Sequence, residues 1–201
     1  MSTRVTLPDK IYSGYIFDLD GTLVDSMSTH YRAWRYALQN NGAPHEAFLW
    51  DEFIAHGGMA APDIVSDLNR IYKLQMNPQL VAAQKRARYD YLLETEKLPI
   101  IEETIGLVRK LKAKNIPYAI GTGSVIDGAR ATLRSAGIEE LFSIIVTPDD
   151  VPPGRGKPEP DIFLLAAERM GVPANECVVF EDAQPGIRAA EAAGMAWVQV
   201  F

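Results

Sequence analysis

The chain has 201 residues, 47% of them hydrophobic and 23% charged, a balance that argues against disorder and is enough to bury a sizeable core. The formal net charge of −6 argues against a general nucleic-acid binder, because such proteins concentrate Lys and Arg against backbone phosphates. A single cysteine, Cys177, excludes an intramolecular disulfide, no apolar run is long enough to cross a bilayer, and the N-terminus lacks signal-peptide features. We therefore expect a cytoplasmic monomer with neither nucleic-acid nor membrane partners.

Short β-type runs that each lead into a turn recur along the chain, and helical patterns separate the later ones. The runs are 15–17, 117–120, 143–146, 178–180 and 197–200, and the helical patterns are 105–115, 127–136, 161–171 and 186–194. Buried parallel strands are apolar in this continuous way, and alternation with helices favours right-handed crossovers. The sequence therefore predicts an α/β fold with a doubly wound, Rossmann-like parallel sheet.

The long stretch between the first two strands has helical spacing and no convincing strand. Its apolar residues recur at Tyr31, Trp34 and Leu38, and then at Leu80, Ala83, Ala87 and Tyr91. We predict an inserted α-helical cap domain at 26–97, with the α/β catalytic core formed by 1–25 and 98–201. A cap over the strand ends would exclude water and select substrates.

The strongest local signal, Asp18-Leu19-Asp20-Gly21-Thr22, follows the first strand directly. Two carboxylates with one residue between them can point the same way from a strand end and share a reacting group. Gly21 permits a sharp turn, and Thr22 can hold the loop by hydrogen bonding. Taken alone, such a turn could be only a hydrogen-bonded loop.

Three further polar motifs follow later strands. Gly121-Thr122-Gly123-Ser124 offers hydroxyls and backbone N–H groups that suit a phosphate, although a helix N-cap would use the same residues. The loop 154–160 surrounds Lys157, and by itself could be a solvated surface loop. Glu181-Asp182 offers hard oxygen ligands that suit Mg²⁺, or could instead cap the next helix. Since ligands of open parallel sheets bind beyond the carboxyl ends of the strands, the four motifs together predict one active site.

These residues resemble the haloacid dehalogenase-like superfamily of phosphotransferases over nearly the whole chain. Asp18 to Thr22 resembles its first motif, Thr122 the second, Lys157 the third and Glu181-Asp182 the fourth. The insertion resembles the C1 type of helical cap. The segments 25–34 and 156–163 are most similar to the branch that contains β-phosphoglucomutase and sugar phosphatases.

The resemblance implies that Asp18 attacks phosphorus and that Asp20 is the general acid for the leaving alkoxide and then the base for water. It implies that Mg²⁺ is held by Asp18, the backbone carbonyl of Asp20 and Asp182, with Glu181 directly or through water. Counting three carboxylates against Mg²⁺ and Lys157 gives zero net charge before substrate binds, which removes the repulsion between a carboxylate and a phosphate.

We expect the remaining candidate residues to contact the substrate. Thr122 is a catalytic candidate with Lys157, and the phosphate-binding candidates are Gly21, Thr22, Gly123 and Ser124. In the expected cap, the resemblance places His30 where members of the branch approach the substrate or the Asp20 position, and Lys85 where some relatives use a cap lysine for the sugar phosphate. A packing histidine and a solvated lysine are the alternatives for these two.

We therefore expect a magnesium-dependent phosphatase that hydrolyses a small phosphorylated metabolite, a sugar phosphate, through a phospho-aspartate. Asp20 argues against a dehalogenase, because halide departs without a proton. The mutases of the branch have a cap arginine near positions 56–62, where this chain has none, but a β-phosphoglucomutase-like mutase remains an alternative. A non-catalytic phosphometabolite-binding protein is a second alternative, since fold alone does not decide activity.

Overall fold

The computed structural model describes Val5, residues 10–57 and residues 59–201, which form two compact units. One unit combines the chain up to Ser26 with Lys97–Phe201, and we call it the core unit. The other, Met27–Glu96, we call the helical unit. That the helical unit acts as a cap stays a prediction.

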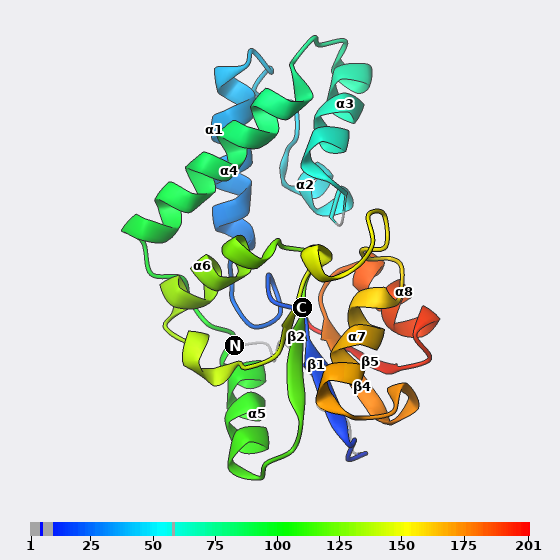
Figure 1. Ribbon diagram of the computed structural model, residues 1–201. Helices are drawn as coiled ribbons and strands as arrows, with labels where there is room; N and C mark the ends of the chain where they lie inside the picture. The colour runs from blue at the N-terminus through cyan, green and yellow to red at the C-terminus, as the bar shows by residue number, and fades with distance from the viewer. Residues whose placement is uncertain (1–4, 6–9, 58) are drawn as a thin grey trace. The chain divides into compact units, whose positions relative to one another are not determined.

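The core unit contains a five-stranded, wholly parallel sheet (Figure 1). Its strands are β1 (Gly14–Phe17), β2 (Tyr118–Gly121), β3 (Ile145–Val146), β4 (Cys177–Glu181) and β5 (Ala196–Gln199), in the order β3-β2-β1-β4-β5. Both β1 and β4 are buried along their whole length, which is why their sequences are apolar without alternation. The predicted fold class is confirmed.

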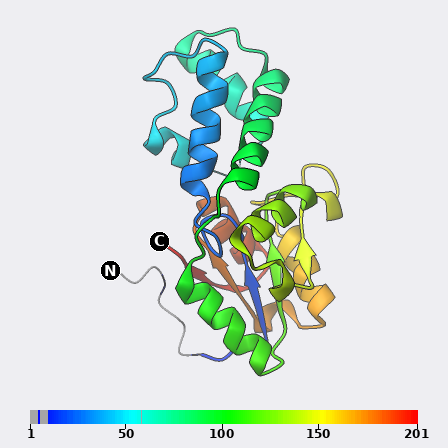
Figure 2. The same ribbon diagram turned by 90° about the vertical axis from the view of Figure 1, so that its left-hand side faces the viewer.

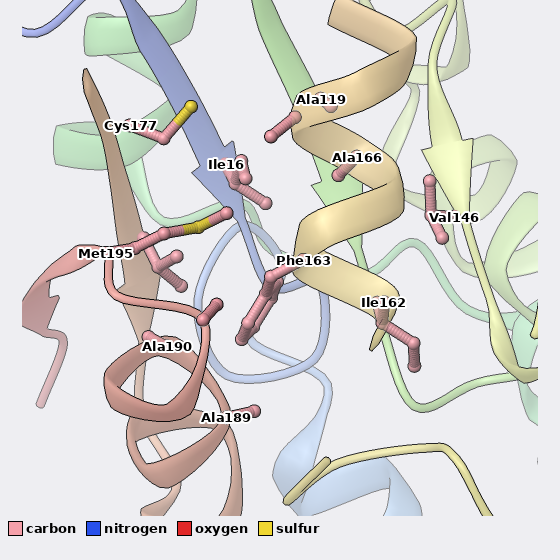
Figure 3. Close-up of a cluster of buried hydrophobic side chains, with 13 residues drawn as sticks. Ile16, Ala119, Val146, Ile162, Phe163, Ala166, Cys177, Ala189, Ala190 and Met195 are labelled. Carbon is pink, nitrogen blue, oxygen red and sulfur yellow. The ribbon is translucent and has the colours of Figure 1, made fainter. Parts of the chain in front are cut away.

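Helices cover both faces of this sheet (Figures 1 and 2). On one side lie α5 (Glu102–Ala113) and α6 (Ile126–Ala136), and on the other α7 (Asp161–Met170) and α8 (Gln184–Ala192). Short 3₁₀ turns occur at Glu139–Leu141, Pro148–Asp150 and Ala174–Glu176. Figure 3 shows the core between α7, α8 and the sheet, where Phe163 of α7 and Ile16 of β1 are both fully buried.

The helical unit has its own hydrophobic core. Its helices are α1 (Met27–Asn40), α2 (Trp50–Ala55), α3 (Ala61–Tyr72) and α4 (Pro78–Thr95), and its described residues contain no strand. Figures 1 and 2 show α1 and α4 side by side. Trp34 and Leu38 of α1 are buried in this core, as their spacing predicts.

The predicted packing face of α4 is wrong. Leu80 and Tyr91 are 50% and 52% exposed, and Ala83 and Ala87 are exposed as well. The buried face consists of Val81, Tyr89, Leu92 and Leu93. The helical period predicted for this segment was correct. The buried face was not, because apolar residues are spread around α4.

Among the described residues, no helix is both long enough and apolar enough to traverse a lipid bilayer.

Candidate active site

The strand order reverses at β1, and the first acidic motif lies at that point. From β1 the chain builds outward through β2 and β3, and it then crosses to β4 and β5 on the other side. Phe17 pairs with Phe180, and the backbone N–H of Asp18 donates to the carbonyl of Phe180 over 2.9 Å. This register brings Asp18, just past β1, beside Glu181, the last residue of β4.

Lys157 links these two carboxylates. Its Nζ donates to Asp18 Oδ1 and to Glu181 Oε1, each at 2.6 Å. All three side chains are less than 10% exposed, so the ion pairs are shielded from solvent. A lysine from the loop before α7 thus neutralises part of the charge that two strand ends bring together.

Three carboxylates offer a suitable site for a divalent cation. Ligand oxygens of Asp18, Glu181 and Asp182 all lie within 4.8 Å of one another. A Cβ on Gly21, which has φ of +90°, would lie 2.3 Å from Asp182 Oδ2, so the turn can hold Asp182 here only with glycine. Hard oxygen donors in a buried cluster fit Mg²⁺.

The carboxylate of Asp20 is held by two serines. Ser26 Oγ donates to its Oδ1 over 2.6 Å, and Ser124 Oγ donates to its Oδ2 over 2.8 Å. The sequence analysis included Ser26 only as part of the segment 25–34, and it predicted no site role for this residue. Its only signal was its position six residues after Asp20.

Thr22 and Thr122, the threonines of the first two motifs, both make hydrogen bonds to residues of this site. Thr122 Oγ1 accepts from the backbone N–H of Ser124 at 3.1 Å, and Thr22 Oγ1 donates to Asp182 Oδ1 over 3.4 Å. Both threonines are buried. The loop after β2, including Gly123, therefore meets the first motif through the Ser124–Asp20 hydrogen bond.

The position of Glu181 depends on Gly186, a residue for which the sequence predicted no site role. Its Oε2 accepts from the backbone N–H of Ala183 at 2.8 Å, at the start of α8. A Cβ on Gly186 would lie 1.8 Å from Glu181 Oε1, so any side chain at this position would displace the carboxylate. The only sequence feature that could have pointed to this role is a glycine in the first turn of the helix that follows the acidic pair.

Comparison with known proteins identifies the family of the chain. A model of the haloacid dehalogenase-like hydrolases matches residues 12–194. The chain belongs to this family. The prediction of an enzyme of this family is confirmed, and relatives similar in sequence carry phosphatase and mutase names.

Three relatives illustrate the range of this haloacid dehalogenase-like family. The fructose-1-phosphate phosphatase YqaB of Escherichia coli is 38% identical, over 94% of this chain and 96% of the relative. The β-phosphoglucomutase of Bacillus subtilis is 30% identical, over 90% of this chain and 79% of the relative. The solved structure of a hydrolase from Pseudomonas syringae is 29% identical with a TM-score of 0.77, over 92% of this chain and 82% of that one.

Burial and like charge shift the acid groups of this family member. Burial raises the pKa of Asp18 well above its ordinary value, the Lys157 ammonium opposes the shift, and Glu181 and Asp182 add to it. Burial, together with Glu181, raises the pKa of Asp182 to about 7. For Lys157, burial lowers the pKa, but Asp18 and Glu181 outweigh it and the net direction is upward. The cluster therefore has an excess of negative charge that a divalent cation would relieve.

The two candidates in the helical unit contact each other. Lys85 Nζ lies 3.0 Å from His30 Nδ1, and the ring of His30 stacks on Tyr89 at 3.8 Å between centroids. Lys85 is partly buried. A role of either residue toward the substrate stays a prediction.

Proposed function

We propose that this chain is a magnesium-dependent phosphatase that hydrolyses a small phosphorylated sugar through a phospho-aspartate on Asp18. The observation that carries the proposal is the joining of Asp18, Glu181 and Asp182 with Lys157 at the switch point of the sheet. A buried carboxylate beside a lysine and a divalent-cation site is equipped for nucleophilic attack on a phosphate.

The first half of the reaction uses Asp18 and Asp20. An oxygen of Asp18 forms a bond to phosphorus while the bond from phosphorus to the sugar oxygen breaks, and Asp20 gives its proton to that oxygen. Asp18, Glu181 and Asp182, with the backbone carbonyl of Asp20, would hold Mg²⁺, whose positive charge would reduce the repulsion between the carboxylate and the phosphate. Lys157 holds Asp18 in place and adds the remaining positive charge.

The second half regenerates the enzyme. Asp20, now ionised, takes a proton from water, the water oxygen attacks phosphorus, and the bond between phosphorus and Asp18 breaks to release inorganic phosphate. Ser26 and Ser124 contact opposite oxygens of Asp20, which fixes the carboxyl plane for both proton transfers. Thr122, Gly123 and Ser124, together with the Gly21–Thr22 turn, are the proposed phosphate contacts.

The side-chain contacts of His56 favour phosphatase activity over mutase activity. A mutase must hold a second phosphate, and His56 is the only basic residue of the stretch 56–62. It is 8% exposed, with Nδ1 2.7 Å from the carbonyl oxygen of Glu52 and Nε2 3.2 Å from Asp67 Oδ2. Both ring nitrogens therefore have partners inside the helical unit, and His56 is not oriented to receive a phosphate.

The proposal is tested by assaying the purified protein for released phosphate against a panel of sugar phosphates that includes fructose 1-phosphate. We expect turnover with Mg²⁺ and its loss after chelation by EDTA, and activity should return when Mg²⁺ is added back. Glucose 1,6-bisphosphate should not accumulate with glucose 1-phosphate as substrate. Phosphate binding without turnover would instead support the non-catalytic alternative, and rapid isomer exchange the mutase.

A further inference from the structure

The ammonium of Lys157 has an aromatic neighbour in addition to its two carboxylates. Its Nζ lies 4.8 Å from the centroid of the Phe163 ring. Phe163 belongs to the first turn of α7 and is fully buried, and Figure 3 shows its side chain extending from α7 into the packed interior. The ring therefore has a fixed position next to the cation.

The end of β2 leaves room for this ring. A Cβ added to Gly121 would lie 2.8 Å from Phe163 Cδ1 and 3.0 Å from Cε1. A side chain at position 121 would push the Phe163 ring away from its place beside the Lys157 ammonium. Gly121 directly precedes Thr122, so the ring lies between the loop after β2 and the lysine of the loop before α7.

We propose that Phe163 is a positioning residue that holds the Lys157 ammonium between Asp18 and Glu181 through its ring face. This inference rests on the proposed function, because it concerns the lysine of the same site. An ammonium has three N–H donors, and the carboxylates of Asp18 and Glu181 take two of them. The ring attracts the cation from another side without adding a further negative charge.

The charge of the site explains why an aromatic ring suits this position. A third carboxylate would hold the ammonium as firmly, but it would add negative charge where a phosphate dianion must bind. An aromatic face attracts a cation through its quadrupole and carries no net charge. The attraction is strongest when the cation is desolvated, and the Lys157 side chain is only 8% exposed.

The competing explanation is that Phe163 only fills space in the core. The two explanations differ in what fluorination of the ring does, because fluorine withdraws electrons from the ring face and changes its volume little. We would replace Phe163 with 4-fluoro-, 3,5-difluoro- and 3,4,5-trifluorophenylalanine. The matched control is the same series at Phe142, a buried core-unit phenylalanine whose ring contacts Tyr118 edge to face.

If the ring face positions Lys157, log kcat should fall steadily with each added fluorine at Phe163, by about tenfold over the series, with KM nearly constant. The reason is that a displaced ammonium spoils the alignment of Asp18 for attack. The series at Phe142 should leave kcat unchanged. A kcat that does not depend on the number of fluorines at Phe163 would overturn the proposal.

A second readout does not depend on activity. The ring current of Phe163 should shift the ε-methylene resonances of Lys157 in the NMR spectrum of the metal-free protein, and Phe163→Leu should remove that shift. Phe142→Leu, with a comparable loss of packing, should leave it. A wild-type protein that shows the shift but hydrolyses no phosphoester would contradict the proposed function alone. The absence of the shift would contradict the positioning role itself.

Discussion

The core unit and the helical unit organise their charged residues differently. In the core unit the decisive contacts join residues far apart in the sequence, as Lys157 with Asp18, 139 positions away, and Ser124 with Asp20, 104 positions away. In the helical unit several ion pairs are local and partly exposed, such as Arg70 with Asp67 and Arg86 with Asp90. The sheet topology thus brings together the residues of the proposed chemistry, whereas these ion pairs of the helical unit need only the local spacing of a helix.

The sharpest test of the chemical role of the core unit is Asp18→Asn. The amide keeps the shape of the side chain but is a poor nucleophile, so kcat should fall by more than about 10⁴-fold. Because burial and neighbouring acids already disfavour the charge of Asp18, the variant should fold normally. Released phosphate and circular dichroism check the two statements. Near-normal turnover by the folded variant would show that Asp18 is not the nucleophile.

Gly186→Ala tests whether the core unit depends on close packing around its acids. The added methyl group would displace the Glu181 carboxylate, and magnesium affinity should fall by about 10–100-fold, as for other groups that orient ligands. Gly106→Ala is the matched control, since Gly106 is also helical and its added Cβ would meet nothing within 4 Å. Isothermal titration with Mg²⁺ gives both affinities. Equal affinities would place Glu181 outside the cation site.

Lys85→Met tests whether the helical unit selects the substrate. Loss of the charge beside His30 should raise KM for the preferred sugar phosphate by about tenfold, while an aryl phosphate without the sugar should be hydrolysed as before. Arg86→Met, which removes only an exposed ion pair on the same helix, should alter neither. If Lys85→Met reduced both activities equally, the division of roles between the units would be wrong.

The smallest expected effect concerns the stability of the metal-free core unit. The pKa of Asp182 is raised from 3.8 to about 7, so the folded state keeps a proton that the unfolded chain releases. This contribution is present below pH 3.8 and is lost as the pH rises toward 7. The Tm should therefore fall by roughly 5 °C between pH 5.5 and 8, and added Mg²⁺ should raise it more at pH 8.

Thermal melts with EDTA and with Mg²⁺ at both pH values would measure this effect. Asp182→Asn is the control, because an amide cannot titrate, and its metal-free Tm should depend less on pH. A wild-type Tm that rises across the same pH interval in EDTA would contradict the proposed burial of negative charge.

The polar motifs could be found from the sequence because three of them directly follow an apolar strand and the fourth, around Lys157, lies in the connection after one. Ser26, Gly186 and Phe163 could not, since their importance comes from what they touch across the fold. On α4 the sequence predicted the wrong face, because large apolar or aromatic residues lie both on the exposed side, as Leu80 and Tyr91, and on the buried side, as Val81 and Leu92. Only packing against the rest of the helical unit chose between these faces.

Hydrophobic period and turn residues act locally, so the approximate strands, the parallel α/β class and the polar segments that follow strands could be predicted from the sequence. The tertiary structure, by contrast, selects which basic side chain contacts the acidic residues of the site. Arg155 pairs with Glu159 of its own loop and with Asp161 at the start of α7, whereas Lys157, two residues later, reaches Asp18 and Glu181. The physical reason is that contacts between distant residues depend on strand register and on side-chain packing, which no local pattern encodes.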